Sequence, residues 1–297
     1  MKDRKNIIVV LNYNDWEETI RFCKMVEPFS SVDMVVIVDN KSTDNSVNEL
    51  KSIQSEKVKL VVAEENRGYA AGNNVGLRFI LDNGLRGNII ISNPDIYFSD
   101  NGLKKILAPL GDERIGVSTG LITMHGNIIS NYAWKVPSFW ELVSNMFLII
   151  YKIKRLLGVS CYLKYPKGEE RVYCNCVSGC FFCMTTKTLQ RVGLFDERTF
   201  LFGEENILGY RMKQAGLKAC VVTSERVEHD QHHSINKSKI SLQRERKWDR
   251  ESISIYIKSY LGKGVVYRKL FCLLYRLALI EQTLILTPLK YIGLYRK

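Results

Sequence analysis

Residues 60–95 constrain the fold of this chain most strongly, because strand-like and helix-like segments alternate within them. Short apolar runs at residues 59–62 and 88–92 are typical of buried strands, and residues 69–81 between them have helical spacing. The second run is ended by Asn93-Pro94-Asp95. Parallel sheets bind ligands beyond the carboxyl ends of their strands. This segment therefore predicts a β-α-β unit of an α/β fold, with Asp95 at the ligand-binding edge.

Three glycines in this unit, Gly68, Gly72 and Gly76, recur at every fourth residue. On a helix this spacing leaves one face without side chains, so that another backbone or a ligand can approach closely. Tight packing of the helix on the sheet explains the same pattern. Both interpretations stay open from the sequence.

The rest of the chain continues the alternation of strand-like and helix-like segments. Further strands are expected at residues 6–11, 34–38, 115–122 and 219–223, and further helices at residues 16–26, 46–53 and 100–109. The first two of these strands end on Asn12 and Asp39. We therefore expect Asn12, Asp39 and Asp95 to meet at one edge of a mostly parallel sheet flanked by helices.

Length and charge limit the class of protein. With 297 residues, 46% of them hydrophobic, the chain can bury one large core with an appended segment. The formal net charge is +12, and residues 237–297 hold 14 lysines and arginines against four acids. The basic surface is therefore expected in the tail. No recognised nucleic-acid-binding motif accompanies it, so nucleic acid is not an expected partner.

The sequence predicts a cytoplasmic protein. Residues 7–11 are too short for the core of a signal peptide, and no uninterrupted apolar stretch reaches the roughly 18 residues needed to span a bilayer. In a reducing compartment the eight cysteines are expected to be free thiols.

Two clusters of candidate metal ligands have a simpler interpretation than a zinc site. One cluster consists of Cys174, Cys176, Cys180 and Cys183, and the other consists of His229, His232 and His233. The cysteine spacing is not a usual zinc-finger spacing, and residues 174–184 also fit an apolar strand interrupted at Ser178-Gly179. We favour buried free cysteines over zinc, and no zinc site at the histidines.

Three polar segments carry a family resemblance. They are Val38-Asp39-Asn40-Lys41-Ser42-Thr43-Asp44, Glu65-Asn66-Arg67-Gly68-Tyr69-Ala70-Ala71-Gly72-Asn73-Asn74-Val75-Gly76 and Asn93-Pro94-Asp95. In this order they resemble the nucleotide-sugar motifs of family 2 glycosyltransferases, and most of all the rhamnosyltransferase-like members of bacterial polysaccharide synthesis. The chain has neither a Walker motif nor Gly-x-Gly-x-x-Gly after the first strand, which argues against a P-loop enzyme and a dinucleotide dehydrogenase.

The resemblance implies a GT-A-like catalytic domain over residues 1–235 that binds a dTDP- or UDP-linked sugar. It implies that Asp39 accepts a hydrogen bond from the pyrimidine base. It also implies that Asp95, with His229, holds Mg²⁺ or Mn²⁺ on the diphosphate, although Asn93 stands where many members have a first acid. The other donor-site residues that it implies are Asn12, Asn40, Ser42, Asn66, Gly68, Gly72, Asn73, Asn93 and Arg211.

Glu204 and Glu205 stand at the start of a predicted helix, where acids by default stabilise the helix dipole. The segment resembles the Glu-Asp motif of the family, which makes Glu205 the catalytic base with Glu204 beside it. Glu205 is one methylene longer than the usual Asp. The family also places a His a few residues before a Ser, which matches His229 and Ser234.

Two apolar segments have alternative interpretations. Residues 134–158 are either a core helix or an acceptor-side flap that touches lipid. Residues 236–297 begin as a charged helix and continue as an apolar segment that Arg268, Lys269, Arg276 and Glu281 interrupt. Each charge near the middle of a spanning helix costs about 2.5–3.5 kcal/mol, so this tail is expected either to lie on an anionic membrane surface or to pack on the catalytic domain.

The expected function is that of an inverting, metal-dependent glycosyltransferase. It would move a sugar, rhamnose as the first choice, to a glycan or lipid-linked glycan of cell-surface polysaccharide, such as O-antigen or capsule. It would work at the inner face of the cell membrane. The alternatives are a sugar nucleotidyltransferase and a non-catalytic, nucleotide-sugar-binding membrane adaptor.

Overall fold

The computed structural model describes residues 4–165, 168–230 and 241–291. The strands are β1 (Lys5–Asn12), β2 (Met34–Asp39), β3 (Val58–Val62), β4 (Gly87–Ser92), β5 (Ile96–Tyr97), β6 (Ile115–Met124), β7 (Asn127–Ile128), β8 (Ala133–Trp134), β9 (Arg171–Cys174), β10 (Cys176–Val177), β11 (Phe181–Thr185) and β12 (Lys218–His229). The helices are α1 (Trp16–Val26), α2 (Ser46–Ser52), α3 (Gly68–Asp82), α4 (Asp100–Leu107), the 3₁₀ helix η1 (Ala108–Gly111), α5 (Phe139–Met146), α6 (Leu148–Leu157), α7 (Thr186–Val192), α8 (Glu204–Gln214), α10 (Leu242–Ser259) and α11 (Val265–Tyr291).

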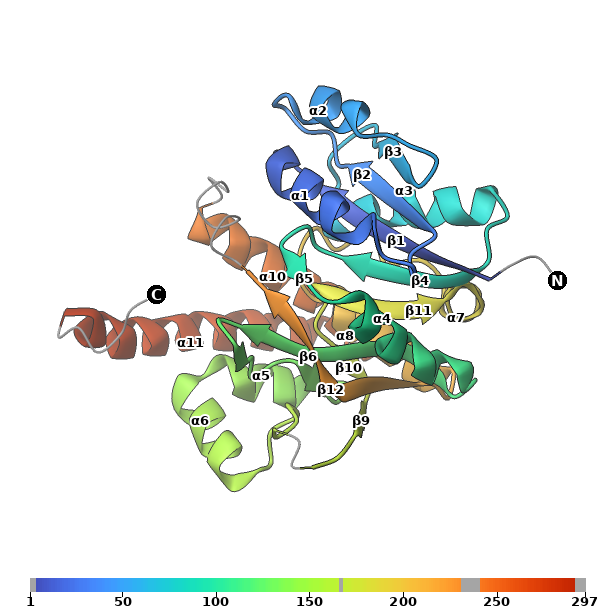
Figure 1. Ribbon diagram of the computed structural model, residues 1–297. Helices are drawn as coiled ribbons and strands as arrows, with labels where there is room; N and C mark the ends of the chain where they lie inside the picture. The colour runs from blue at the N-terminus through green and yellow to red at the C-terminus, as the bar shows by residue number, and fades with distance from the viewer. Residues whose placement is uncertain (1–3, 166–167, 231–240, 292–297) are drawn as a thin grey trace.

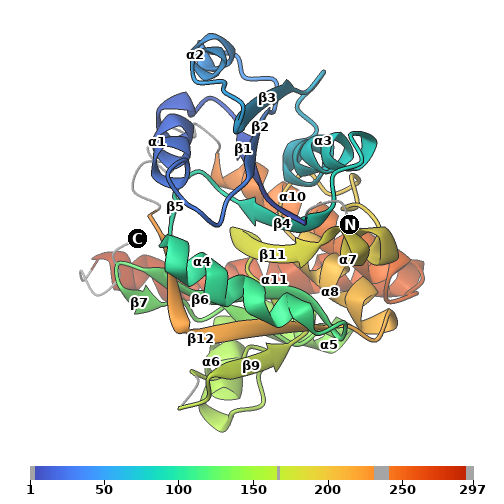
Figure 2. The ribbon, with the colours of Figure 1, turned by 45° about the vertical axis from the view of Figure 1, so that its right-hand side comes forward.

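The main sheet has the strand order β3-β2-β1-β4-β11-β6-β12-β5. Figures 1 and 2 show helices α1, α2 and α3 around the end of the sheet that β1, β2 and β3 form, and α5 and α6 at the opposite end. The predicted α/β sheet flanked by helices is confirmed, and a helical C-terminal segment is present.

The strands β3, β2, β1 and β4 run parallel to one another. Their buried Ile and Val runs are typical of strands that are covered on both faces. Asn12 pairs with Asp39 in the register of β1 and β2, and Val10 pairs with Ser92 of β4. The three strands therefore end at the same edge, as predicted from their sequences.

The second half of the sheet is mixed, which the sequence did not predict. Residues 174–184 form parts of three strands: β9 pairs with β12, β10 with β8, and β11 runs antiparallel between β4 and β6. Strand β12 is longer than the expected 219–223. A register shift between Val222 and Arg226 takes the intervening polar residues out of the ladder, and pairing with β6 then resumes.

The glycines of α3 serve close packing. A Cβ atom on Gly68, whose φ is +89°, would lie 2.0 Å from the Phe200 carbonyl oxygen. A Cβ on Gly72 would lie 2.6 Å from the Leu11 side chain, and one on Gly76 would lie 2.6 Å from Val9. The packing interpretation of this spacing is therefore the one that the structure supports.

The apolar segment 134–158 contains both a core helix and an exposed helix. Helix α5 buries Phe139, Leu142 and Val143, whereas α6 has no buried residue. The core-helix interpretation thus holds for α5 only.

The tail helices pack on the rest of the chain. Tyr256 and Ile257 of α10 and Phe271 and Tyr275 of α11 form a second buried cluster with residues of α5 and with Ile207 of α8. By length and composition alone, Val265–Thr287 of α11 is long and apolar enough to cross a membrane, with a mean hydropathy of 1.6. Charges at Arg268, Lys269, Arg276 and Glu281 interrupt this segment, so it contains no uninterrupted apolar stretch of about 18 residues. The predicted boundary at residue 235 lies outside the described residues.

Candidate active site

Asp39 organises the edge where β1 and β2 end. It is fully buried, and its carboxylate accepts hydrogen bonds from Asn12 Nδ2 at 2.8 Å, the Ser42 hydroxyl at 2.6 Å and the Ser42 N–H at 2.9 Å. The Thr19 hydroxyl donates to Asn12 Oδ1 at 2.8 Å. A carboxylate offers about four acceptor positions, and here Ser42 in the turn after β2 uses two of them and Asn12 of β1 uses a third. Asn12 and Ser42 therefore position the Asp39 carboxylate by donating hydrogen bonds to it.

A second network fastens the loop before α3 to the end of β2. Asn40 Nδ2 donates to Asn66 Oδ1 at 3.1 Å and to the Gly68 carbonyl at 3.2 Å, and the Gly68 N–H donates to Asn66 Oδ1 at 3.0 Å. The side-chain oxygens of Asn40 and Asn73 are buried and have no hydrogen-bond partner within the described part of the chain. Leaving a buried acceptor unpaired is costly, so both oxygens are candidates to accept a bond from a ligand.

Asp95 and His229 meet where β12 ends beside β5. Asp95 Oδ2 lies 3.3 Å from His229 Nε2, and both residues are buried. Burial lowers the pKa of His229, but its hydrogen bond to Asp95 and its contact with Cys180 outweigh burial and raise this pKa to about 10. At neutral pH the two groups therefore form an ion pair.

The same two side chains fit a divalent cation. They offer one hard carboxylate oxygen and one imidazole nitrogen that converge from two elements, once the histidine has lost its proton. Mg²⁺ and Mn²⁺ are commonly held by one or two protein ligands together with phosphate oxygens. The donor set is thus compatible with an ion that a diphosphate helps to bind.

The cysteines do not form a metal site. In the described ranges, no group of three or more His, Cys, Asp or Glu side chains is placed to hold a metal ion. All eight cysteines are free thiols, and the predicted burial is confirmed for seven of them. His232, His233 and Ser234 lie outside the described residues.

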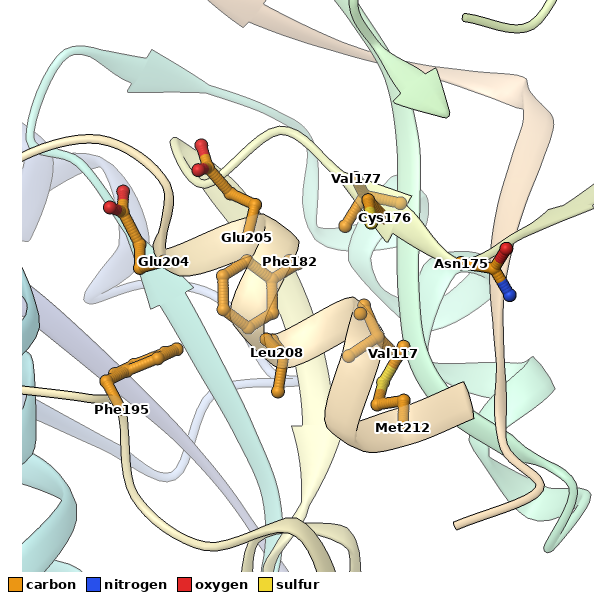
Figure 3. Close-up of a pocket in the computed structure, with 11 residues that line it drawn as sticks. Val117, Asn175, Cys176, Val177, Phe182, Phe195, Glu204, Glu205, Leu208 and Met212 are labelled. Carbon is orange, nitrogen blue, oxygen red and sulfur yellow. The ribbon is translucent and has the colours of Figure 1, made fainter. Parts of the chain in front are cut away.

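Glu204 and Glu205 form the third part of the site, at the start of α8. Gly203 precedes them in the left-handed region, with φ of +82°. Glu205 Oε1 accepts a hydrogen bond from the Gly179 N–H at 3.2 Å. Figure 3 shows both carboxylates pointing the same way, away from the apolar side chains of Leu208 and Met212. The helix start therefore presents two acids on one side.

The two acids differ in environment. Burial raises the pKa of Glu204 well above its usual range, the charge of Glu205 raises it further, and Glu204 Oε2 has no partner among the described residues. Burial also raises the pKa of Glu205, while backbone N–H groups, including that of Gly179, oppose the rise. Two neighbouring acids titrate as a pair, and this arrangement favours the ionised form at Glu205. Glu205 is therefore the better candidate for a base.

A small cavity lies behind the two acids, between α8 and the sheet. It is lined mainly by apolar side chains, including Phe182, Phe195, Leu208 and Met212, and its volume is about 10 Å³ (Figure 3). Such a volume has room for about one water molecule and none for a sugar. The substrate side of the acids is accordingly the side toward which their carboxylates point.

Residues 178–180 connect the parts of the site, and the sequence did not single them out as functional. The Tyr69 hydroxyl donates to the Gly179 carbonyl at 2.7 Å, and the Gly179 N–H donates to Glu205. The next residue, Cys180, accepts a hydrogen bond at its carbonyl from the Asn93 N–H at 2.8 Å, and its thiol contacts His229. One short loop therefore contacts both the candidate base and the Asp95–His229 pair. The only sequence signal was the interruption of a strand at Ser178-Gly179.

The tail also contributes to this site. The Trp248 ring stacks on Phe200 with centroids 4.3 Å apart, and the Ser252 hydroxyl donates to the Leu201 carbonyl at 3.0 Å. Asp249 lies between them on α10, and its charge raises the pKa of Glu205. Burial raises the pKa of Asp249 itself to about 6. Helix α10 therefore covers the loop that leads into Glu204 and Glu205.

Three predicted donor-site residues have other contacts in the structure. Gly68 and Gly72 face Phe200 and Leu11, as described above. Arg211 donates to the Leu194 carbonyl and, at 2.8 Å, to the Tyr260 hydroxyl, which ties α8 to α10. Arg211 lies six residues along α8 from Glu205 and therefore on a different side of the helix, where it makes this packing contact. The ligand-binding role that the resemblance implies for these three residues stays a prediction.

The mixed sheet and the similar solved structures together place this chain in the GT-A fold class. The solved structure of GalNAc-T7 with UDP, GalNAc and Mn²⁺ is similar, with a TM-score of 0.58 and 18% identity over 86% of this chain and 48% of that one. The structure of the mannosyltransferase PcManGT from Pyrobaculum calidifontis, in complex with GDP-Man and Mn²⁺, is also similar. Its TM-score is 0.57, and the identity is 14% over 99% of this chain and 82% of that one. These likenesses establish the fold.

The chain belongs to glycosyl transferase family 2. The model of this family matches residues 7–166, and a model described as glycosyltransferase-like family 2 matches residues 161–250. The low-salt glycan biosynthesis hexosyltransferase Agl10 of Haloferax volcanii is 25% identical over 211 residues, which cover 71% of this chain. The chain spans 62% of the length of that relative.

Proposed function

We propose that this protein is an inverting glycosyltransferase that transfers a sugar from a nucleotide-diphosphate donor to a glycan acceptor. The observation that supports it best is the loop at Gly179 and Cys180, which contacts Glu205 on one side and the neighbourhood of Asp95 and His229 on the other. A base and a diphosphate-binding pair that contact the same short loop fit an in-line displacement at an anomeric carbon, which requires both groups beside the reacting atoms.

In this proposal Glu205 takes the proton from the acceptor hydroxyl as that oxygen attacks the anomeric carbon. The C–O bond to the acceptor forms, the bond to the diphosphate breaks, and the diphosphate leaves with the bonding electrons. General-base assistance of this kind contributes about 10²–10⁴-fold to a rate. The raised pKa of Glu205 suits it to hold that proton near neutral pH.

Asp95 and His229 would hold a Mg²⁺ or Mn²⁺ ion on the diphosphate. When bound, this cation would supply Lewis-acid stabilisation of the leaving group, so that no proton is needed there. The Mn²⁺ in the GalNAc-T7 and PcManGT structures supports this proposal. A single acid, Asp95, with Asn93 at the neighbouring position predicts weak metal affinity in the absence of nucleotide.

For the donor we propose a hexose or deoxyhexose on dTDP or UDP, with dTDP-rhamnose first because of the Asn-Pro-Asp segment. The base would lie near Asp39 and Asn40, where one acceptor position on the carboxylate and the Asn40 oxygen remain as candidate acceptors for its single imide N–H. The Haloferax relative is named a hexosyltransferase, which supports a hexose-type donor. The acceptor that we propose is a lipid-linked glycan of cell-surface polysaccharide, glycosylated at the inner face of the membrane.

The test is thermal stabilisation of the full-length chain by dTDP-, UDP- and GDP-sugars, each with and without Mn²⁺ or Mg²⁺. A ligand at about 100 times its dissociation constant adds roughly 2.7 kcal/mol to the free energy of unfolding. We expect one donor class to stabilise wild type only with metal, to stabilise the half-exposed control Asp112→Ala in the same way, and to lose this effect in Asp95→Ala. No stabilisation by any of these sugars would contradict the proposal and favour the adaptor alternative.

A further inference from the structure

Two helices from distant parts of the sequence each expose a stripe of large aliphatic side chains. On α6 the stripe consists of Ile149, Ile150, Ile153, Leu156 and Leu157, which are 42–85% exposed. Their spacing is that of one face of an amphipathic helix, yet this face is turned to solvent. On α11 the stripe consists of Leu273, Leu277, Ile280 and Leu284, which are 46–69% exposed.

Helix α11 has a second apolar face on its opposite side. Phe271, Tyr275 and Ala278 are buried, and they lie about half a turn around the helix from Leu273, Leu277 and Ile280. The buried face packs in the cluster shared with α5, α8 and α10. The exposed stripe is thus not needed to hold the helix in place.

Glu281 joins the two exposed stripes. Its carboxylate accepts hydrogen bonds from the N–H groups of Leu148 at 2.8 Å and Ile149 at 3.2 Å, so it caps the start of α6 from the side of α11. Gln282 adds a bond to the Met146 carbonyl at 2.9 Å. Figure 1 shows α11 running beside α5 and α6. The acid that interrupts the apolar sequence therefore serves to fix α6 beside α11.

The charges around these stripes have one sign. Residues 148–157 and 265–291 contain seven lysines and arginines, and Glu281 is their single acid. Lys152 on α6 and Lys269 and Arg276 on α11 are exposed, and the last two follow the same helical face as Leu273 and Ile280. An apolar stripe with cationic flanks fits an interface between hydrocarbon and anionic headgroups.

We propose that the exposed stripes of α6 and α11 together form a membrane-binding face that lies in the plane of an anionic lipid surface. A second copy of this chain is a poorer occupant, because a two-fold contact would bring the same cations against one another. A spanning arrangement of α11 would break the bonds of Glu281 and expose Phe271 and Tyr275. This proposal rests on the proposed function, because a membrane-binding face would bring the enzyme to a lipid-linked acceptor.

The test is co-sedimentation of the full-length chain with vesicles of phosphatidylcholine alone or of phosphatidylcholine with phosphatidylglycerol. We expect binding to the anionic vesicles that weakens as salt is raised. Leu156→Asp with Leu284→Asp should weaken it about tenfold or more, since two apolar anchors become charged. Lys152→Glu with Arg276→Glu should remove the preference for phosphatidylglycerol. Because all four side chains are exposed, the melting temperatures should stay near that of wild type.

The matched controls are Val62→Asp, an exposed apolar position on β3, and Lys51→Glu on α2, and both should bind as wild type does. Glu205→Gln should also bind vesicles normally, which separates this proposal from the proposed function. Equal binding to both vesicle types, or full binding by the Leu156/Leu284 variant, would overturn the proposal. A wild-type dimer that the same variant converts to a monomer would assign the face to a second copy, and resistance to alkaline carbonate extraction would assign α11 to a membrane span.

Discussion

At the scale of single residues, the site depends on backbone groups as much as on the acids. Glu205 is held by the Gly179 N–H, and Gly179 is held in turn by the Tyr69 hydroxyl. The sequence predicted the acids, because their residue types resemble a family motif. It did not predict Gly179, since the need for a glycine there arises only when α8 and the loop before β11 come together.

Replacing Gly179 with alanine should displace the candidate base. The added Cβ would lie 2.9 Å from Glu205 Oε1 and 3.3 Å from its carboxyl carbon, so the carboxylate has to move. We expect kcat to fall by about 10–100-fold, part of the 10²–10⁴-fold contribution of a general base, with little change in donor affinity. The matched control is Gly111→Ala, where a Cβ meets no atom within 4 Å. Unchanged kcat in Gly179→Ala would show that Glu205 is not positioned by this contact.

The rate of sugar transfer should rise with pH along the acidic limb of the pH–rate profile, and the position of this limb should report the pKa of Glu205. A base acts when deprotonated, and burial raises the pKa of Glu205, so the limb should lie above pH 4.5. The charge of Asp249 also disfavours ionised Glu205. Asp249→Asn should therefore lower this pKa and move the limb to lower pH, whereas Glu251→Gln, exposed on the same helix, should leave it in place. A pH–rate profile of each variant measures the position of this limb. A limb that moves to higher pH in Asp249→Asn would contradict this electrostatic account.

At the scale of elements, the parallel half of the sheet could be predicted and the mixed half could not. The strands β1 to β4 are buried on both faces and read as continuous Ile and Val runs, which local sequence reveals. The position of β11 between β4 and β6 depends on pairing with residues 65–97 positions away. Likewise, nothing in the sequence around Glu281 indicates that its partner is the start of α6.

Loss of the Glu281 carboxylate should destabilise the contact between α6 and α11. In Glu281→Ala two N–H groups at the start of α6 lose their acceptor, and loss of a helix cap costs about 0.5–2 kcal/mol. Denaturant unfolding measures this, with the exposed Thr283→Ala as the control on the same helix. A variant as stable as wild type would show that the cap contributes nothing to the free energy of unfolding.

At the scale of the whole molecule, the tail belongs to the folded structure. Phe271 is fully buried in the cluster that joins α5, α8, α10 and α11, and Trp248 of α10 stacks over the loop that precedes the acids. From the sequence, docking and membrane binding of the tail were open alternatives. The structure shows docking through one face of α11, while the opposite face stays exposed.

Phe271→Ala should lower the free energy of unfolding of the whole protein by about 3–5 kcal/mol, the usual cost of truncating a buried aromatic side chain. Leu284→Ala on the exposed stripe should change it by no more than about 0.5 kcal/mol. Both values come from urea denaturation of the full-length chain. If both variants changed the free energy of unfolding by equally small amounts, α11 would not be packed in the core of the protein.

The measurement that tests the central claim most directly compares transfer and donor binding in Glu205→Gln. The variant keeps the size of the side chain and removes the base, so transfer should fall about 10²-fold or more while the dissociation constant of the donor stays near that of wild type. The exposed control Glu64→Gln should retain full transfer. Turnover near the wild-type rate in Glu205→Gln would contradict the assignment of Glu205 as the catalytic base.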